Sequence, residues 1–357
     1  MRTFHTTGPC LGGQHFTVDW SNRLNRPVAA LKRGESLFIA RGRQTGKTTF
    51  LRALGHAARR ENLAVALCSL QVAEDQTLLG LLRHIEATVH AAYPVPALPK
   101  WNPTEPQSLA FCFYLGDVQK RLGKPLVLFL DEYDSPPRKL TCALLRTFRS
   151  ALSLQDETRP FIHAIVLCGK THVRDLRDDL RPSSDETRGS GSLWNIALPV
   201  NLTNFSETEM ASLIREYSQH SGVQFAKKCC SELWDKTRGQ PWLLCRILSQ
   251  IDEQVGYPRP ESQSEGPSVS VQDVRSIVNQ ILNEDCVHLL SVSDAIRDRK
   301  EAQEFLQNLL TVGSTDIDKS DETQSYLLDM GIVSISDSGQ QVEISNPIYE
   351  SYLLKTL

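Results

Sequence analysis

The chain has 357 residues, enough for two or three domains with a sizeable core. Apolar residues make up 40% of it and charged residues 23%, which is ordinary for a globular protein. No run of 18 or more apolar residues exists, so a membrane span is excluded by this criterion. The N-terminal residues lack a secretory apolar core, and we therefore expect a cytoplasmic protein with no membrane partner.

The cysteines and the charge distribution exclude further kinds of site. The nine cysteines include no Cys-x-x-Cys pair, which predicts reduced thiols and neither a zinc site nor a disulfide framework. Residues 271–357 hold 15 Asp/Glu and 6 Lys/Arg, a net charge of −9, whereas residues 1–270 have a net charge of +6. Binding of nucleic acid by the C-terminal part is disfavoured, because phosphate contacts need clustered Lys and Arg.

The pattern of residues 1–36 indicates an irregular N-terminal segment with a short helix near 26–33. The most informative motif of the chain follows this segment. The apolar run 37–40 predicts a buried strand. A loop then ends in the sequence GKTT at 46–49, and a helical pattern begins at Phe50 within a predicted helix 47–61. This strand–loop–helix layout is typical of a phosphate-binding P-loop.

The chemistry expected of this loop is specific. Main-chain amides and the positive end of the helix hold the β-phosphate of a nucleotide. Lys47 is expected to reach the β- and γ-phosphates as a catalytic residue, and the Thr48 hydroxyl to ligate Mg²⁺. The residues predicted to bind nucleotide here are Gly42, Gln44, Thr45, Gly46, Lys47, Thr48 and Thr49.

One position departs from the common P-loop pattern. Counting back from Gly46, the first glycine position holds Arg41, and a glycine stands one place later at Gly42. The alternative interpretation is a basic surface loop between a strand and a helix. The correct strand–helix context and a second motif disfavour that alternative.

The second motif is the sequence LVLFLDEYD at 126–134. Its five apolar residues predict a fully buried strand of a parallel sheet. Asp131 and Glu132 follow at the carboxyl end of the strand, where ligands bind in open α/β sheets. We expect Asp131 to hold Mg²⁺ as a Walker B aspartate and Glu132 to act as the general base. The alternative is a strand that ends in a solvated acidic turn.

Strands alternate with helices over 37–203, which predicts a parallel sheet in three layers. The pattern predicts further strands at 65–70, 161–168 and 196–202, helices at 72–92, 107–122 and 139–154, and loops at 93–106 and 176–193. The last loop is expected to be mobile and to lie beside the nucleotide.

The remainder reads as a helical lid, a linker and a small C-terminal domain. Ser206 and Glu209 form a capping box that begins an all-helical lid over 204–254. Residues 255–270 resemble a linker. In 271–357, the predicted elements are helices at 271–283, 301–310, 321–330 and 347–354, a C-cap at Gly331, and strands at 332–335 and 341–344. Helices followed by a β-hairpin suggest a winged helix.

Taken together, these motifs make the chain similar to bacterial AAA-like P-loop ATPases of the STAND and archaeal-ATPase type, which are related to origin-recognition ATPases. The resemblance spans nearly the whole chain and includes the sequences RQTGKTT at 43–49, DEYD at 131–134, RGQPWL at 238–243 and NPIY at 346–349. It implies a three-layer P-loop NTPase of AAA/ASCE type with a helical lid and a C-terminal winged helix, and ATP and Mg²⁺ as cofactors.

The resemblance also assigns roles outside the two motifs. Gly239 and Pro241 resemble a Gly-x-Pro element that packs the lid against adenine and ribose; the alternative is a helix-breaking turn. The Gly8-Pro9 segment is expected to cover the adenine from the other side. Candidate sensor residues are Lys170, Thr171, Arg174 and, in the lid, Arg246, and candidate arginine fingers are Arg146, Arg149 and Arg159. Solvated helix arginines are the alternative for each finger candidate.

Two functions fit these observations. The first is an ATP-binding and slowly ATP-hydrolysing switch, a homo-oligomer that contacts a protein partner through its acidic C-terminal domain. The second is a DNA-associated ATPase oligomer, with a basic strip at Arg174, Arg177, Arg181 and Arg188. A small-molecule kinase and a nucleotide-binding protein without turnover are weaker alternatives.

Overall fold

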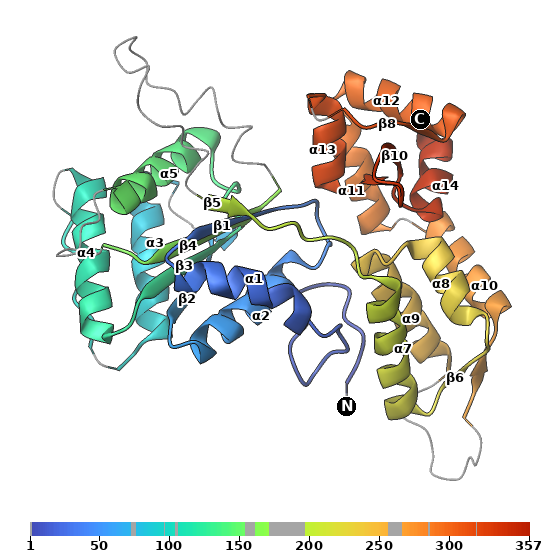
Figure 1. Ribbon diagram of the computed structural model, residues 1–357, viewed down its shortest axis with the longest axis horizontal. Helices are drawn as coiled ribbons and strands as arrows, with labels where there is room; N and C mark the ends of the chain where they lie inside the picture. The colour runs from blue at the N-terminus through green and yellow to red at the C-terminus, as the bar shows by residue number, and fades with distance from the viewer. Residues whose placement is uncertain are drawn as a thin grey trace. The chain divides into compact units, whose positions relative to one another are not determined.

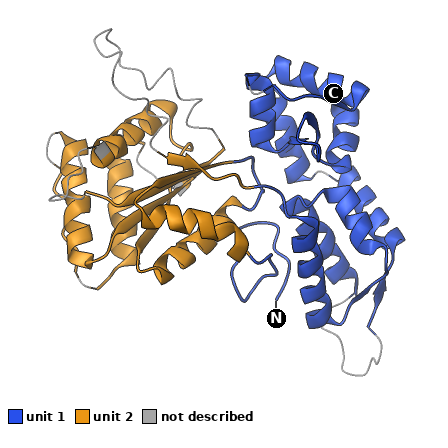
Figure 2. Ribbon diagram, viewed as in Figure 1, with its two compact units in different colours: residues 1–19, 41–46, 203–357 blue, residues 20–40, 47–202 orange. Residues whose placement is uncertain are grey.

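The structure is a computed structural model of the chain, and it describes residues 2–72, 76–95, 97–103, 106–153, 161–170, 197–255, 266–284, 286–318 and 320–357. The chain divides into two compact units (Figure 2). We call residues 20–40 and 47–202 the α/β unit, and residues 1–19, 41–46 and 203–357 the helical unit. Within the described ranges, no helix is both long enough and apolar enough to cross a membrane.

A five-stranded parallel sheet forms the centre of the α/β unit. Its strands lie in the order β2-β3-β4-β1-β5. Their bounds are β1 Ser36–Ala40, β2 Ala64–Ser69, β3 Leu126–Asp131, β4 Ala164–Gly169 and β5 Ala197–Pro199. The register pairs Asp131 with Ser69 on one side and with Cys168 on the other, so the carboxyl ends of β2, β3 and β4 meet at one edge. This confirms the predicted P-loop NTPase fold.

Helices cover both faces of this sheet, which gives the expected three layers (Figure 1). The helices of the unit are α1 Ser21–Lys32, α2 Lys47–Arg60, α3 Leu78–Ala92, α4 Gln107–Leu122 and α5 Arg138–Ser153, with a 3₁₀ turn at Leu70–Val72. Helices α1 and α2 pack together on one face, and α3, α4 and α5 form the layer on the other. Strands β3 and β4 are buried along their full length, as continuous apolar runs predict.

Several boundaries in this unit differ from the sequence prediction. The helix predicted at 72–92 begins only at Leu78, because the Thr77 side chain accepts a hydrogen bond from the Gly80 amide and caps the helix there. The short helix near 26–33 begins earlier, at Ser21. The predicted strand 196–202 is reduced to Ala197–Pro199. The predicted loop 176–193 lies outside the described residues.

The helical unit contains the predicted lid helices and the C-terminal elements. Its helices are α7 Glu207–Ser221, α8 Cys229–Thr237, α9 Pro241–Val255, α10 Val271–Asn283, α11 Val287–Ile296, α12 Lys300–Val312, α13 Glu322–Met330 and α14 Pro347–Thr356. The Ser206–Glu209 capping box begins α7 as predicted. Helix α10 packs on α8 and α9, so the lid helices and the C-terminal elements form one packed body.

Short strands complete this unit. The three-stranded antiparallel sheet has the order β8-β10-β9, with β8 Ser314–Asp316, β9 Val333–Ile335 and β10 Gln341–Ile344. Gly331 ends α13 in the left-handed conformation, as predicted. Two further strands, β6 Gln224–Phe225 and β7 Ser268–Val269, pair in parallel. The end of the predicted linker is therefore structured, and the expectation of an all-helical lid was wrong at β6.

The turn before α9 requires glycine. Gly239 has a φ of +68°, and its carbonyl oxygen accepts a hydrogen bond of 2.9 Å from the Phe205 amide. A Cβ added at Gly239 would collide with the Phe205 carbonyl oxygen. Gly239 is therefore required by the backbone whether or not it contacts a nucleotide.

Replacing this glycine should destabilise the protein more than replacing a glycine that has only a positive φ. Gly222 has a φ of +74° and nothing within 4 Å of an added Cβ. We expect Gly222→Ala to cost about 1–2 kcal/mol of unfolding free energy, and Gly239→Ala clearly more because of the collision. Urea unfolding followed by circular dichroism measures both, and equal losses would contradict this account of the turn.

Candidate functional site

The predicted phosphate loop runs directly into the start of a helix. Gly46 has a φ of +81°, and helix α2 begins at the next residue, Lys47. The first N–H groups of a helix have no intrahelical partner, and the helix dipole makes this end positive. The amides of Lys47 and Thr48 are therefore suited to an anionic phosphate.

A hydrogen bond joins the two sequence motifs. The Thr48 hydroxyl donates a hydrogen bond of 2.7 Å to Asp131 Oδ2, although 83 residues separate them. Asp131 is buried at the carboxyl end of β3. A carboxylate and a hydroxyl are oxygen ligands of the kind that Mg²⁺ prefers, usually together with waters and substrate phosphates. The residues present thus fit the ion that the sequence predicts, with Thr48 and Asp131 as its protein ligands.

Lys47 is set up to receive an anion. Burial lowers the pKa of its ammonium group, and the negative charges of Asp131 and Asp134 only partly offset this effect. A polyphosphate bound beside this ammonium group would stabilise its charged form. Such binding is the role that the sequence predicts for Lys47.

Glu132 has an unusual backbone and a perturbed carboxyl group. Its φ is +52°, a left-handed conformation that is uncommon for a residue with a side chain. Burial, followed by the charge of Asp131, raises the pKa of Glu132. The Ser69 hydroxyl lies 3.4 Å from Glu132 Oε2, and the Gln71 amide, oriented with its NH₂ group toward Glu132, lies 2.6 Å from the same oxygen. These neighbours orient the carboxylate predicted to act as the general base.

Ser69 and Gln71 are not among the residues predicted from the sequence. Ser69 is the last residue of β2 and Gln71 lies in the 3₁₀ turn that follows, and the sheet order places β2 beside β3. In the sequence they are recognisable only as polar residues at the end of an apolar run. The order of the strands in the sheet was needed to show that they lie beside Glu132 at the end of β3.

The end of β4 supplies a second polar contact near this edge. The Lys170 amide donates a hydrogen bond of 3.0 Å to Asp134 Oδ2. A Cβ at Gly169 would lie 2.7 Å from Asp134 Oδ1 and from the Tyr133 ring, so the close approach of β4 to this turn requires glycine. Of the sensor candidates, Lys170 is thus beside the turn that follows β3, while Thr171 and Arg174 lie outside the described residues.

The finger candidates are only partly described. Arg146 and Arg149 lie on α5, the first exposed and the second half-buried. Arg159 and the proposed basic strip, which includes Arg177, Arg181 and Arg188, lie outside the described residues.

The lid residues come together with the loop inside the helical unit. The Gln240 side chain donates a hydrogen bond of 3.2 Å to the main-chain oxygen of Gln44, and the Thr45 hydroxyl donates one of 2.9 Å to the Gly42 oxygen. Pro241 is buried as the first residue of α9. The sequence singled out Gly239 and Pro241, but the loop contact belongs to the residue between them.

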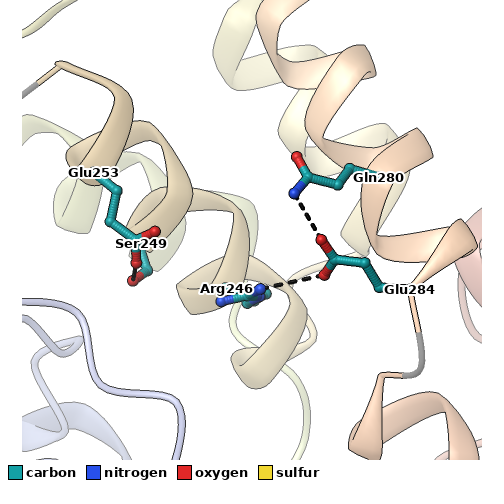
Figure 3. A network of polar contacts seen from close by, with 5 residues as sticks. All are labelled: Arg246, Ser249, Glu253, Gln280 and Glu284. Atoms are coloured by element: carbon teal, nitrogen blue, oxygen red, sulfur yellow. Dashed lines mark hydrogen bonds and ion pairs between the residues drawn. The ribbon is translucent and has the colours of Figure 1, made fainter.

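Arg246, the lid sensor candidate, is engaged within the helical unit (Figure 3). Its guanidinium lies 3.4 Å from Glu284 Oε2, and Gln280 donates a hydrogen bond of 2.6 Å to the other oxygen of Glu284. The pair Ser249–Glu253 lies further along the same helix as Arg246. A role in nucleotide sensing would require Arg246 to leave this partly exposed ion pair, which costs little.

Comparisons with known proteins support the fold. No protein-family model matches the chain, and no curated protein sequence matches it. A solved structure, the Walker-type ATPase of Pyrococcus abyssi, is similar with a TM-score of 0.67 and 14% identity, covering 98% of this chain and 99% of that one. At this identity the likeness shows a shared fold over the whole chain.

Two other solved structures are more distantly similar. Cdc6p of Pyrobaculum aerophilum has a TM-score of 0.48 at 14% identity and covers 98% of this chain and 96% of its own. The ORC2 protein of Aeropyrum pernix has a TM-score of 0.47 at 15% identity and covers 99% and 96%. Both scores are too low to carry an argument about this chain.

Lys47→Ala should remove nucleotide binding because the variant lacks the cation that is expected to contact the phosphates. At an ADP concentration of 100 times Kd, the wild type should gain about 2.7 kcal/mol of stability, and the variant almost none. Thermal unfolding with and without Mg²⁺ and ADP measures the difference. Lys32→Ala, which removes an exposed lysine paired with Glu61 in the same unit, is the control and should keep the full gain. A Lys47→Ala variant that keeps it would exclude Lys47 from the site.

Hydrolysis should fail in acid as Glu132 becomes protonated. The pKa of Glu132 is raised above its ordinary 4.5, and a protonated carboxyl group cannot accept a proton from water. We therefore expect kcat/KM to fall as pH decreases through that raised pKa. Gln71→Leu removes a donor that favours the ionised carboxylate, so the acid limb should move to higher pH.

The control for this pH profile is Ser108→Ala, which removes a hydroxyl that pairs with Thr147 between α4 and α5. Its acid limb should coincide with that of the wild type. An unchanged limb in Gln71→Leu would mean that Gln71 does not hold the catalytic carboxylate.

Proposed function

We propose that this chain binds ATP with Mg²⁺, hydrolyses it, and works as an AAA/STAND-like switch that couples its nucleotide state to a protein partner or to self-assembly. The observation that carries the proposal is the 2.7 Å contact between Thr48 and Asp131 at the carboxyl edge of the sheet. It unites the loop–helix motif with the acidic strand end, and neither motif alone distinguishes a nucleotide site from its structural alternative.

The residues have separate tasks in this mechanism. Lys47 binds the β- and γ-phosphates, and the helix amides hold the same group from the other side. Thr48 and Asp131 would hold Mg²⁺, which when bound would supply positive charge beside the phosphates. Glu132 orients the attacking water and takes its proton as the bond from the γ-phosphorus to the leaving oxygen breaks. ADP and phosphate are the products.

The C-terminal elements are proposed to form a winged helix that faces a protein. Helix α13 precedes the β9–β10 hairpin, and β8 adds a third antiparallel strand. The sequence of α13, ETQSYLLDM, contains no Lys or Arg, and residues 271–357 have a net charge of −9. A helix that enters a DNA groove needs basic residues around it, so a protein partner fits this surface better. DNA association is retained as an outcome of the experiment below.

Self-assembly is the second part of the proposal. Arg146 on α5 is exposed, as a finger that acts on a neighbouring copy has to be. Such an arginine would make turnover depend on protein concentration, because the complete site would form only in the oligomer.

The decisive experiment compares ATP hydrolysis by the wild type and Glu132→Gln, with the mass of each measured with and without ATP. Loss of the general base should reduce kcat by roughly 10²–10⁴ while ATP binding persists. The matched control is Glu61→Gln, which removes an exposed ion pair with Lys32 and should leave ATP hydrolysis unchanged. Wild-type turnover together with ATP-driven assembly supports the switch.

Two results would contradict the proposal. ATP binding with neither turnover nor assembly would indicate a static nucleotide-clamped scaffold. Retention of duplex DNA that declines steeply with salt would favour the DNA-associated alternative, because released counterions would then dominate binding.

A further inference from the structure

The first half of the phosphate loop is held by the C-terminal end of α13. The Gly42 amide donates a hydrogen bond of 2.9 Å to the Asp329 oxygen. A Cβ at Gly42 would collide with the Met330 carbonyl oxygen, so only glycine permits this approach. All three residues belong to the helical unit. Gly42 therefore fixes the loop to the last turn of α13.

Arg41, which occupies the first glycine position of the motif, points to the same region. Its guanidinium donates a hydrogen bond of 3.0 Å to Asn204 Oδ1. It also lies close to Gly331, where an added Cβ would be 3.3 Å from Arg41 Nη2. The departure from the common P-loop pattern thus coincides with a set of contacts within the helical unit.

The second half of the loop is held through Gln44. Its φ is +57°, a strained value for a residue with a side chain, and such a conformation persists only where neighbours support it. Gln240 binds its main-chain oxygen at 3.2 Å, and His288 Nδ1 lies 2.6 Å from its side-chain Oε1. The lid turn and helix α11 therefore hold one loop residue from two sides.

The His288 ring is buried and makes contacts with three other side chains. Only 2% of it is exposed, its Nε2 lies 2.7 Å from the Tyr349 hydroxyl, and its ring stacks on Trp242 with centroids 4.7 Å apart. Burial lowers the pKa of His288 to about 3, so the ring is neutral at physiological pH. A neutral imidazole has one donor and one acceptor. Because Gln44 Oε1 only accepts, Nδ1 donates to Gln44, and Nε2 accepts from Tyr349.

We propose that His288 is a positioning residue for nucleotide binding, which holds the phosphate loop through Gln44 and links that loop to helices α11 and α14. The inference rests on the proposed function, and it names the residues through which the C-terminal elements sense the nucleotide. A loop already fixed in its binding conformation loses less freedom when a ligand binds. By linkage, a nucleotide that favours the held loop must favour the His288–Tyr349 arrangement to the same extent.

Two tyrosines of α14 provide a matched test in the full chain. Tyr349 bonds to His288 on α11, and Tyr352 bonds at 2.8 Å to Ser293 on the same helix without reaching the loop. Both Tyr→Phe variants remove one hydroxyl between α14 and α11. We expect Tyr349→Phe to weaken ADP binding at least about 5-fold, within the range of typical couplings, and Tyr352→Phe to leave it unchanged. Titration calorimetry with Mg²⁺ and ADP measures both affinities.

A double-mutant cycle separates positioning from general destabilisation. If His288 acts through Gln44, His288→Ala should weaken ADP binding in the wild type but have little further effect in a Gln44→Ala background. Thermal unfolding of each variant without nucleotide verifies that it is folded. Additive effects, equal affinities in all variants, or tighter binding by Tyr349→Phe would each overturn the inference.

Failure of the inference is distinguishable from failure of the proposed function. If wild type itself does not bind ADP or ATP, the proposed function fails. If wild type binds nucleotide and Tyr349→Phe binds it equally well, only the positioning role of His288 is excluded.

Discussion

The hydrogen bond between Thr48 and Asp131 is the interaction on which the candidate site depends, because it fixes the start of α2 against the end of β3. The parallel register makes it possible. Ser69, Asp131 and Cys168 are aligned across three neighbouring strands, so polar residues that end separate apolar runs meet at one edge. The strands that lead to this edge are apolar. The Asp131 carboxylate and the Thr48 hydroxyl at the edge are oxygen groups of the kind that bind a hard cation.

Burial shifts the pKa values of Lys47 and Glu132 in opposite directions. It lowers the pKa of Lys47 and raises the pKa of Glu132, so each group is less stable in its charged form than in water. A bound polyphosphate with its cation would supply negative charge beside Lys47 and positive charge beside the carboxylates. Such a ligand would therefore favour the charged form of each group. The positive φ of Glu132 adds backbone strain at the same point.

The helical unit combines the lid helices with the C-terminal elements around one short stretch of loop. Gly42 and Gln44 are bound by three separate parts of that unit: the end of α13, the turn before α9, and His288 on α11. A change in the conformation of the loop would alter buried contacts in α11 and α14, which gives the proposed switch a physical connection between nucleotide and partner surface.

The sequence alone predicted the loop–helix pattern at 37–50, the strand that ends at Asp131, the parallel sheet and helix α4. Apolar runs, glycines and prolines reveal these features because each acts on the backbone close to its own position. The capping box at Ser206 and the C-cap at Gly331 were predictable for the same reason. Only the tertiary structure decided that Ser69 and Gln71 accompany Glu132, since this follows from strand order. It also added α11, which has no side-chain cap at Cys286 and is stabilised by packing on α12 and α14. The pairing of His288 with Gln44 joins residues 244 positions apart, and no local pattern encodes such a contact.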